Sequence, residues 1–155
     1  MSVPAEHPAL VIRPFAESDE DAVVALWAAA GLTRPWNDPR KDIARKLTVQ
    51  REWFLVATRR GEVVGSVMGG YDGHRGWVNY LAVAPDAGRR GVGRALMDAV
   101  ELRLRAAGCP KINVQVRATN RSALGFYEAL GYARDDVVSL GRRLEHDEAP
   151  PNEVG

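Results

Sequence analysis

The stretch NYLAVAPDAGRRGVGRALMDAVELRLR, residues 79 to 105, predicts a strand, a short basic glycine loop and a long helix. Residues 79 to 84 alternate in polarity and are rich in strand-forming side chains, and Pro85 ends the run. Beyond the loop, apolar residues recur at the spacing of one helical face: Val92, Ala95, Leu96, Ala99, Val100 and Leu104. This strand–loop–helix unit is the strongest local pattern in the chain.

The loop in this unit concentrates positive charge. Arg89, Arg90 and Arg94 gather where the helix begins, although the helix dipole and unpaired amides already make that end positive. Each cation is disfavoured there by up to about 1 kcal/mol, unless an anion such as a phosphate binds in the loop. Three glycines allow backbone amides to approach such a ligand: Gly88, Gly91 and Gly93. The alternative is that the arginines are simply solvated on an exposed turn.

The letters of the loop exclude two common phosphate-binding motifs. No Gly-Lys-Ser/Thr ends it, as a nucleotide-hydrolase loop requires, and the third glycine of a dinucleotide fingerprint would fall at Leu96. The stretch instead resembles the acyl-coenzyme A loop of the GNAT superfamily of N-acetyltransferases, with the pattern Gln/Arg-x-x-Gly-x-Gly/Ala after a strand. GRRGVG, residues 88 to 93, occupies that pattern, with Gly88 where Arg or Gln is usual.

A second stretch carries the same resemblance. VRATNRSALGFYEALGY, residues 116 to 132, is similar to the closing motif of the superfamily: an Asn, a short helix, then aromatic-Tyr-Glu-x-Leu-Gly-aromatic. The resemblance implies that Asn120 hydrogen-bonds the pantetheine arm and that Tyr127 points its hydroxyl at the thioester sulfur. Taken alone, Tyr127 would more often be a core residue of an amphipathic helix.

The resemblance implies both a fold and an activity. Strands interspersed with helices already indicate an α/β (α+β) domain, and the family implies a mixed, mainly antiparallel central sheet flanked by helices on both faces. The implied activity is that of an acyl-CoA-dependent N-acyltransferase, which moves an acetyl group from acetyl-CoA, its co-substrate, to a primary amine by direct attack; no metal is expected. The implied cofactor contacts are Leu81, Ala82, Val83, Gly88, Arg89, Arg90, Gly91, Val92, Gly93, Arg94, Asn120 and Tyr127.

The implied mechanism needs a general acid, an oxyanion donor and a means to deprotonate the amine. Tyr127 would protonate the leaving thiolate, and a strand amide near Leu81 would stabilise the oxyanion. Relatives that acetylate protein N-termini place a glutamate where this chain has Gln115, which cannot usefully accept a proton at neutral pH. A water chain could serve instead, and the candidate bases are His74, Asp72 and Tyr80.

Two polar loops are expected to form the acceptor pocket for a small polar amine. RPWNDP, residues 34 to 39, and MGGYDGHRG, residues 68 to 76, are similar to those of the YpeA-type bacterial acetyltransferases. The side chains expected to converge are Arg34, Trp36, Asn37, Asp38, Asp72 and His74. Alternatively, the first loop merely caps the helix that follows it. Two other functions remain open: a protein or peptide acetyltransferase acting on N-termini or lysines, and a non-catalytic acyl-CoA sensor.

Length and composition limit the remaining options. The 155 residues suit one domain, and 46% hydrophobic and 26% charged residues are ordinary for a globular protein. A net charge of +1 gives no reason to expect nucleic acid or a membrane as partner. A single cysteine, Cys109, and the absence of a long apolar run or signal-like start favour a cytoplasmic protein. Dimers are common in such folds, so a homodimer is suggested by analogy only.

Periodicity and turn residues predict the other elements. Residues 1 to 9 are expected to be a flexible N-terminus and residues 145 to 155 a disordered acidic tail, leaving 10 to 144 as a single N-acetyltransferase domain. Strands are expected at 10–14, 53–58, 62–69, 111–116 and 137–144. Helices are expected up to Gly31 after a Ser18 cap, around Ile43 to Leu47, and at 120–130. Three glycines suggest a bulge or a close backbone approach: Gly65, Gly69 and Gly70.

Overall fold

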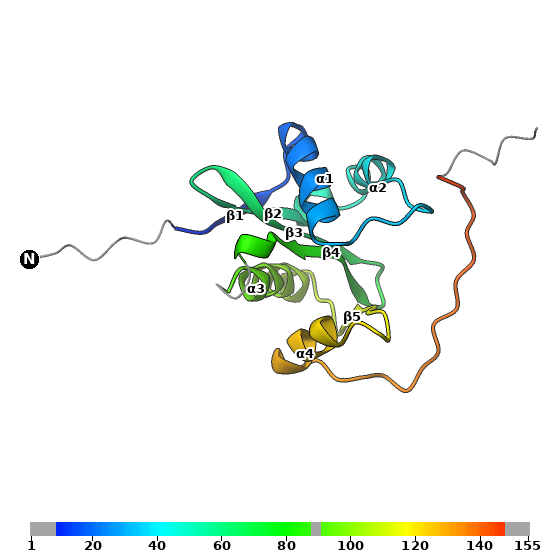
Figure 1. The fold of residues 1–155 in the computed structure, drawn as a ribbon. Helices are drawn as coiled ribbons and strands as arrows, with labels where there is room; N and C mark the ends of the chain where they lie inside the picture. Colours follow the sequence, from blue (N-terminus) through cyan, green and yellow to red (C-terminus); the bar gives the residue numbers. More distant parts are fainter. Residues whose placement is uncertain (1–8, 88–90, 148–155) are drawn as a thin grey trace, which may run out of the picture.

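The computed structural model describes residues 9–87 and 91–147. Its helices and strands are β1 (Val11–Pro14), α1 (Glu20–Ala29), α2 (Pro39–Lys46), β2 (Phe54–Arg59), β3 (Glu62–Tyr71), β4 (Gly76–Val83), α3 (Val92–Ala106), β5 (Ile112–Val114) and α4 (Arg121–Ala129). Most of the two predicted terminal segments lies outside the described residues, as do Gly88, Arg89 and Arg90 of the basic loop. Figure 1 shows α1 and α2 on one face of a sheet and α3 on the other.

The sheet has five strands in the order β1-β2-β3-β4-β5. β1 to β4 are antiparallel neighbours, whereas β4 and β5 are parallel, so that α3 can cross over between them. The β2–β3 turn has φ of 51° at Arg60 and 78° at Gly61, the pair of positive angles that a tight two-residue hairpin uses. This mixed, mainly antiparallel sheet with helices on both faces confirms the predicted fold class.

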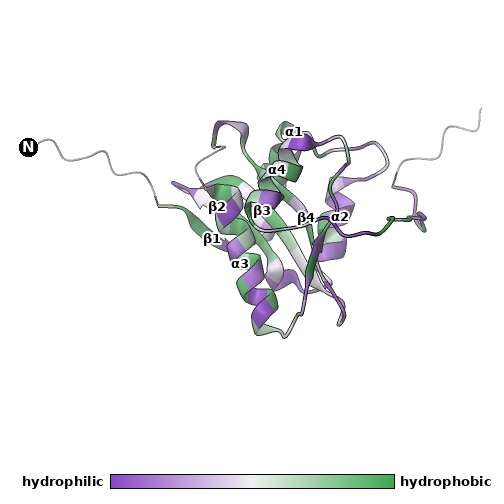
Figure 2. Ribbon diagram, turned by 90° about the horizontal axis from the view of Figure 1, so that it is seen from below, coloured by the Kyte–Doolittle hydropathy of each residue, from purple (hydrophilic) through white to green (hydrophobic). Residues whose placement is uncertain are grey.

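Apolar side chains are buried on both faces of the sheet. Phe54 and Val56 of β2 pack toward α1 and α2, while Leu55 and Ala57 pack toward α3, and all four are 0% exposed. Adjacent strand residues point to opposite faces, so the continuous apolar run FLVA fits a strand covered on both sides. Figure 2 shows hydrophilic and hydrophobic residues alternating along α3, whose apolar face covers the sheet.

Glycines in β3 let α3 lie unusually close to the sheet. A Cβ atom added at Gly65 would lie 2.8 Å from side-chain carbons of both Leu96 and Val92, and one added at Gly69 would lie 3.0 Å from Val100. The pairing of β2 with β3 is also irregular beside Gly65, between Ala57 and Thr58. The predicted close approach is therefore confirmed at Gly65 and Gly69 and the bulge beside Gly65, whereas a Cβ atom at Gly70 would meet nothing nearer than Gln50 Oε1 at 3.5 Å.

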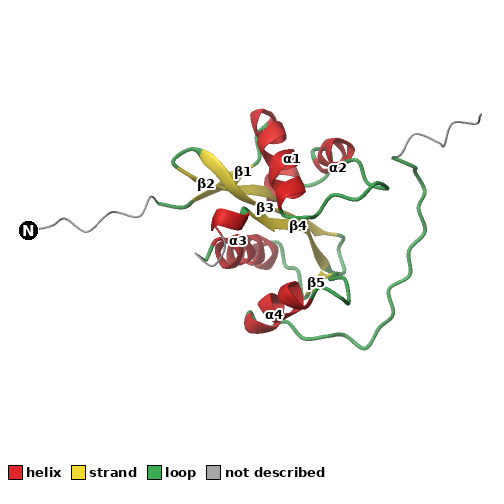
Figure 3. Cartoon of the chain, viewed as in Figure 1, coloured by secondary structure: helices red, strands yellow, loops and turns green. Residues whose placement is uncertain are grey.

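The predicted last strand, residues 137 to 144, is wrong. The segment after α4 is a loop that belongs to no sheet (Figure 3). Its large apolar side chains are between 76% and 91% exposed: Val137, Val138, Leu140 and Leu144. A strand needs a neighbour that supplies backbone hydrogen bonds, and β5, which was expected at 111–116, extends only from Ile112 to Val114.

The predicted Ser18 cap is also wrong. The chain enters α1 through a short 3-10 turn, Glu17–Asp19, and Ala16 stands before that turn. Asp19 accepts the Ala16 N–H at 2.8 Å and forms a two-point ion pair with Arg13, at 2.7 and 2.9 Å. The Asp19 carboxylate thus takes the capping role that was predicted for Ser18, because a carboxylate can accept from a backbone amide and pair with an arginine at the same time.

Candidate active site

The candidate site lies where β4 and β5 separate. The two strands pair only from Gly76–Ile112 to Val78–Val114, whereas β4 continues to Val83 alongside β3. Residues 79 to 83 therefore have no strand partner on the β5 side among the described residues. Such an edge offers backbone amides and carbonyls to an extended ligand.

β4 carries a bulge at the same place. Ser66 of β3 pairs with Ala82, but Met68 pairs with Asn79, so three steps along β4 match two along β3. Tyr80 lies in the extra length and has a φ of 51°, in the left-handed region that few non-glycine residues occupy. A bulge leaves one residue outside the ladder and redirects its neighbours, which makes this a suitable place for a backbone donor to face a ligand.

Side chains from three other elements hold the bulge. Trp27 Nε1 donates to Ser66 Oγ at 2.8 Å, and Ser66 Oγ donates to the Tyr80 carbonyl at 3.0 Å. The Tyr80 ring stacks on Trp27 with 3.8 Å between centroids, and its hydroxyl donates to Asp42 Oδ2 at 2.5 Å. The sequence did not predict the supporting roles of Trp27, Ser66 and Asp42. Its one usable signal was the polar Ser66 inside an apolar strand.

The start of α3 lies beside the end of β4. Gly91 has a φ of 75° and precedes the helix, and no side chain of the described residues caps the first turn. A Cβ atom at Gly93 would lie 3.1 Å from the Phe126 ring, so this glycine is also needed for α4 to pack against α3. Arg94 is exposed at this end of the helix.

α4 presents the second motif to the same region. Asn120 caps the helix, since its Oδ1 accepts the Ala123 N–H at 3.1 Å, and its amide group makes no other hydrogen bond in the described part of the chain. Tyr127 packs edge-on to Phe126 and Tyr132, with ring centroids 5.1 and 5.5 Å away. Its hydroxyl makes no hydrogen bond with any described residue, and burial raises the pKa of Tyr127 to about 12.

The contacts of the candidate bases disfavour two of them. Burial and the hydrogen bond to Asp42 raise the pKa of Tyr80 far above its usual range, so the phenol stays protonated. Asp72 Oδ1 accepts the N–H groups of Arg75 and His74 at 2.7 and 2.8 Å, and these bonds lower the pKa of Asp72. A carboxylate with a lowered pKa is a weak base. His74 lies exposed in the same β3–β4 turn.

The loop before α2 uses several of its predicted acceptor residues for local structure. Arg34 donates to the carbonyls of Gly31 and Thr33 at 2.9 and 2.8 Å. Asp38 caps α2 by accepting the Arg40 N–H at 2.9 Å, as the alternative interpretation of this loop expects.

The other side of this loop contacts Arg117, which precedes α4, and residues near the end of the chain. The Arg117 guanidinium lies 5.7 Å from the centre of the Trp36 ring, and Arg143 donates to Asn37 Oδ1 at 2.8 Å. The Asp38 N–H donates to Asp147 Oδ2 at 2.9 Å. Among the described residues, no hydrogen bond, ion pair or ring contact joins this loop to the turn that carries Asp72 and His74, so convergence of the two loops stays a prediction.

The described residues lack two features that would point to other classes of site. Within 9–87 and 91–147, no group of three or more His, Cys, Asp and Glu side chains is arranged to hold a metal ion. In the same ranges, no helix is both long and apolar enough to cross a membrane.

Known proteins similar to this chain share its fold. The acetyltransferase ECA0875 of Pectobacterium atrosepticum is 52% identical over 136 residues, which cover 88% of this chain and 96% of that protein. The crystal structure of Ard1 from Thermoplasma volcanium is 29% identical, with a TM-score of 0.67 over 81% of this chain and 83% of that one. The aminoglycoside N-acetyltransferase AAC(6′)-Iy, solved with CoA, has a TM-score of 0.74 over 92% of this chain and 99% of its own, at 18% identity.

The family assignment rests on a family model and on the half-identical relative. The model of the acetyltransferase (GNAT) family matches residues 20–132, which include α1 to α4 and both motifs. The predicted closeness to the YpeA-type proteins stays a prediction. The match to the family model and the half-identical acetyltransferase together show that this chain belongs to the GNAT family of acetyltransferases.

Proposed function

We propose that this protein is an N-acetyltransferase that moves the acetyl group of acetyl-CoA to a primary amine by direct attack in a ternary complex. The early end of β4–β5 pairing is the observation that carries the proposal. It leaves the edge formed by Leu81, Ala82 and Val83 free of strand pairing among the described residues, where pantetheine amides would pair like a short strand.

The beginning of α3 would hold the pyrophosphate. Backbone amides of a first turn without a side-chain cap bind anions, and the helix dipole favours negative charge there. The residues proposed for this contact in the described part are Gly91, Val92, Gly93 and Arg94. For Gly88, Arg89 and Arg90 the proposal rests on the sequence motif. The CoA complex of AAC(6′)-Iy supports a cofactor of this class, although at its low identity that protein shares the fold alone.

The acetyl group would react beside the bulge. The amine nitrogen bonds to the thioester carbon, a backbone N–H near Leu81 stabilises the oxyanion, and the carbon–sulfur bond then breaks. Tyr127 donates its phenolic proton to the departing thiolate. The hydroxyl supports this role because no protein acceptor in the described residues competes for its proton, and burial, which raises the pKa of Tyr127, keeps it protonated at neutral pH. Asn120 would bind the pantetheine arm through its free amide.

The amine would lose its proton to water. Tyr80 is held as a donor to Asp42, and Asp72 is stabilised as a carboxylate by two backbone N–H groups. Of the candidate bases, His74 alone has an exposed side chain that makes no hydrogen bond or ion pair among the described residues, so it would contact such a water chain. Turnover would then rise with pH through the pKa of the acceptor amine.

The acceptor would be a small polar amine. The loop at 34–38 is tied at Asn37 and Asp38 by the end of the chain, and Arg117 covers Trp36, which favours a bounded pocket over an open groove. Arg34, Asp72 and His74 would border that pocket. AAC(6′)-Iy is an aminoglycoside N-acetyltransferase, which shows that this fold can serve a small-molecule acceptor.

The test combines cofactor binding with turnover. Acetyl-CoA at a hundredfold over its dissociation constant should stabilise the wild type by about 2.7 kcal/mol in thermal unfolding. Thiol release against panels of small amines and peptides then identifies the acceptor. Tyr127→Phe should lower kcat by about 10²- to 10⁴-fold while the thermal shift persists. Tyr71→Phe is the matched control, since that hydroxyl bonds only the Gly73 carbonyl in an exposed turn.

Each outcome has a distinct meaning. No thermal shift with acetyl-CoA contradicts the cofactor site, and full turnover by Tyr127→Phe contradicts the general acid. Turnover with peptides but not with small amines would indicate a protein or peptide acetyltransferase. A thermal shift without turnover on any acceptor would indicate a sensor.

A further inference from the structure

The end of α4 turns Tyr132 back onto the helix beside Tyr127. Gly131 has a φ of 93° and its N–H donates to the Glu128 carbonyl at 3.0 Å, while the Tyr132 N–H donates to the Tyr127 carbonyl at 3.0 Å. This pair of hydrogen bonds around a left-handed glycine is the Schellman motif that ends many helices. It fixes the backbone of Tyr132 relative to Tyr127, so the sequence YEALGY, residues 127 to 132, places the two tyrosines together.

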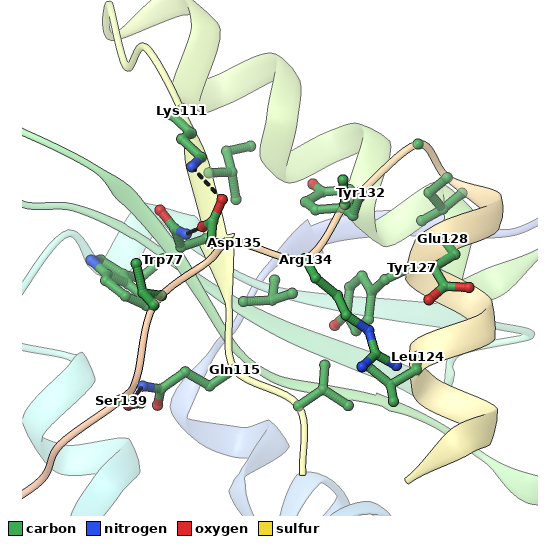
Figure 4. A pocket seen from close by; sticks show the side chains of 18 of the residues that line it. Trp77, Lys111, Gln115, Leu124, Tyr127, Glu128, Tyr132, Arg134, Asp135 and Ser139 are labelled. Carbon is green, nitrogen blue, oxygen red and sulfur yellow. Dashed lines mark hydrogen bonds and ion pairs between the residues drawn. The ribbon is translucent and has the colours of Figure 1, made fainter. Parts of the chain in front are cut away.

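The Tyr127 ring contacts two other aromatic rings. Tyr132 meets it edge-on, with centroids 5.5 Å apart and planes at 69°, and Phe126 does so at 5.1 Å and 72°. Edge-to-face contact is a favourable geometry for aromatic pairs. Figure 4 shows Tyr127 on α4 and Tyr132 on the segment after it, both lining a groove of about 1210 Å³ beside β5. The orientation of the Tyr127 ring therefore depends on where these two neighbours are held.

Helix α3 holds both neighbours. The Tyr132 hydroxyl donates to Glu101 Oε1 at 2.6 Å, and burial together with this hydrogen bond raises the pKa of Tyr132 well above its usual range, so the hydroxyl remains a donor. The Glu101 side chain makes no other hydrogen bond and no ion pair among the described residues. Phe126 packs on Gly93, where a Cβ atom would lie 3.1 Å from its ring. The first turn of α3 thus restrains one neighbour by packing, and the third turn restrains the other by a hydrogen bond.

We propose that Tyr132 and Glu101 are positioning residues for Tyr127: the hydrogen bond between them holds the Tyr132 ring, and through it the Tyr127 ring, so that the Tyr127 hydroxyl keeps its direction toward the thioester sulfur. This inference rests on the proposed function, which makes Tyr127 the general acid. The Tyr127 hydroxyl has no hydrogen bond among the described residues to fix that direction. Proton transfer needs donor and acceptor within hydrogen-bond reach, and a displacement of about 1 Å can cost about 100-fold in rate.

Steady-state kinetics test the positioning. Tyr132→Phe, which keeps the ring and removes the hydroxyl, and Glu101→Ala should each lower kcat by about 10- to 100-fold and leave the KM for acetyl-CoA unchanged. Glu101→Gln should keep most of the wild-type kcat, because its amide oxygen can still accept from the Tyr132 hydroxyl. Asp98→Ala removes an exposed carboxylate one turn earlier on α3; it is the control and should match the wild type.

A double variant shows whether the effect passes through Tyr127. Tyr132→Phe should cause no further loss of kcat in a Tyr127→Phe background, because the hydroxyl that it positions is already absent. A contact that only fastens α4 to α3 would lower the stability measured by urea denaturation and leave kcat unchanged. That result, or a fully additive loss in the double variant, overturns the inference.

Tyrosine NMR separates this inference from the proposed function. The ring signals of the four tyrosines, with Tyr127 assigned through Tyr127→Phe, report how fast each ring flips without any turnover. The Tyr127 ring should flip faster in Tyr132→Phe and Glu101→Ala than in the wild type or in Asp98→Ala. Equal flip rates overturn the positioning even if the enzyme is active. Faster flipping in the variants of a protein that has no turnover contradicts the general acid and supports the restraint.

Discussion

Residues 62–106 and residues 131–147 contrast in what holds them in place. In the first region, β3, β4 and α3 are joined by backbone ladders and by apolar packing so close that Gly65 and Gly69 admit no side chain. In the second region, the chain is held by side-chain hydrogen bonds and ion pairs, several of them at exposed residues. Burial and backbone pairing act over the whole length of an element, whereas each polar tether fixes one point.

The contrast matters for function. The bulge at Tyr80 costs backbone strain, and it is supported by the buried Trp27 and Ser66 within the rigid region. Among the described residues of the tethered segment, 131–147, Arg143 and Asp147 are the two that bond the loop at residues 34–38. The proposed chemistry therefore rests on the rigid region.

Overpacking beneath α3 should have the largest effect. Gly65→Val would place atoms within 3 Å of Leu96 and Val92, so we expect a loss of about 3 kcal/mol in the free energy of unfolding, measured by urea denaturation. Gly125→Val in α4 is the matched control, because nothing lies within 4 Å of that position. Equal stability of the two variants would mean that α3 does not rest on the β3 backbone.

Removing the bulge support should have the next largest effect. Ser66→Ala leaves the buried Trp27 N–H without its acceptor, and we expect about 2 kcal/mol of destabilisation together with lower turnover. The comparison is Ser139→Ala, which removes a hydroxyl contact in the tethered segment and should leave the stability of the domain unchanged. A similar loss in both variants would contradict the contrast between the regions.

Lowering the pH should remove the stabilisation that the Arg13–Asp19 ion pair gives to the start of α1. The hydrogen bonds from Arg13 lower the pKa of Asp19, so its contribution is complete above the ordinary aspartate pKa of about 3.9 and is lost as the pH falls below it. Urea denaturation between pH 6 and pH 3 should show the wild type losing about 1 kcal/mol more than Asp19→Asn. Parallel pH curves for the two proteins would remove this role from Asp19.

Releasing the end of the chain should have the smallest effect on stability. Asp147→Ala removes the acceptor of the Asp38 N–H and the partner of Arg45, so hydrogen exchange at the Asp38 amide should accelerate. The global unfolding midpoint should stay where it is, since the contact restrains a terminal segment only. Glu145→Ala, whose side chain makes no hydrogen bond or ion pair among the described residues, is the control; unchanged exchange in both would contradict the tether.

Local patterns were enough to predict most elements of the fold. Side-chain periodicity predicts the helical face from Val92 to Leu104. Glycine placement predicts the β2–β3 turn at Arg60 and Gly61 and the close approach at Gly65. Both signals act over a few residues. The family resemblance in the two motifs was likewise a local signal, and the match to the family model confirms it. The cofactor and acceptor residues taken from that resemblance stay proposals.

The failures came from contacts between distant parts of the chain. Residues 137–144 have the composition of a strand, but a strand also needs a backbone partner, and the short β5 gives none within the described residues. Ser18 has the character of a cap, yet Asp19 is the residue that can also pair with Arg13. In both cases, a neighbour from elsewhere in the chain decided between local options.

The sequence by itself determined the order of helices and strands from β1 to α4, the glycine positions that bring α3 to the sheet, and the family. Only the tertiary structure decided the bulge at Tyr80, the roles of Trp27, Ser66 and Asp42 around it, and the point at which β4 and β5 separate. The physical reason is the distance along the chain over which each effect acts. Propensity and periodicity are properties of neighbours in sequence, whereas the angle at Tyr80 and the free edge beside it depend on which side chains the folded sheet and helices bring together.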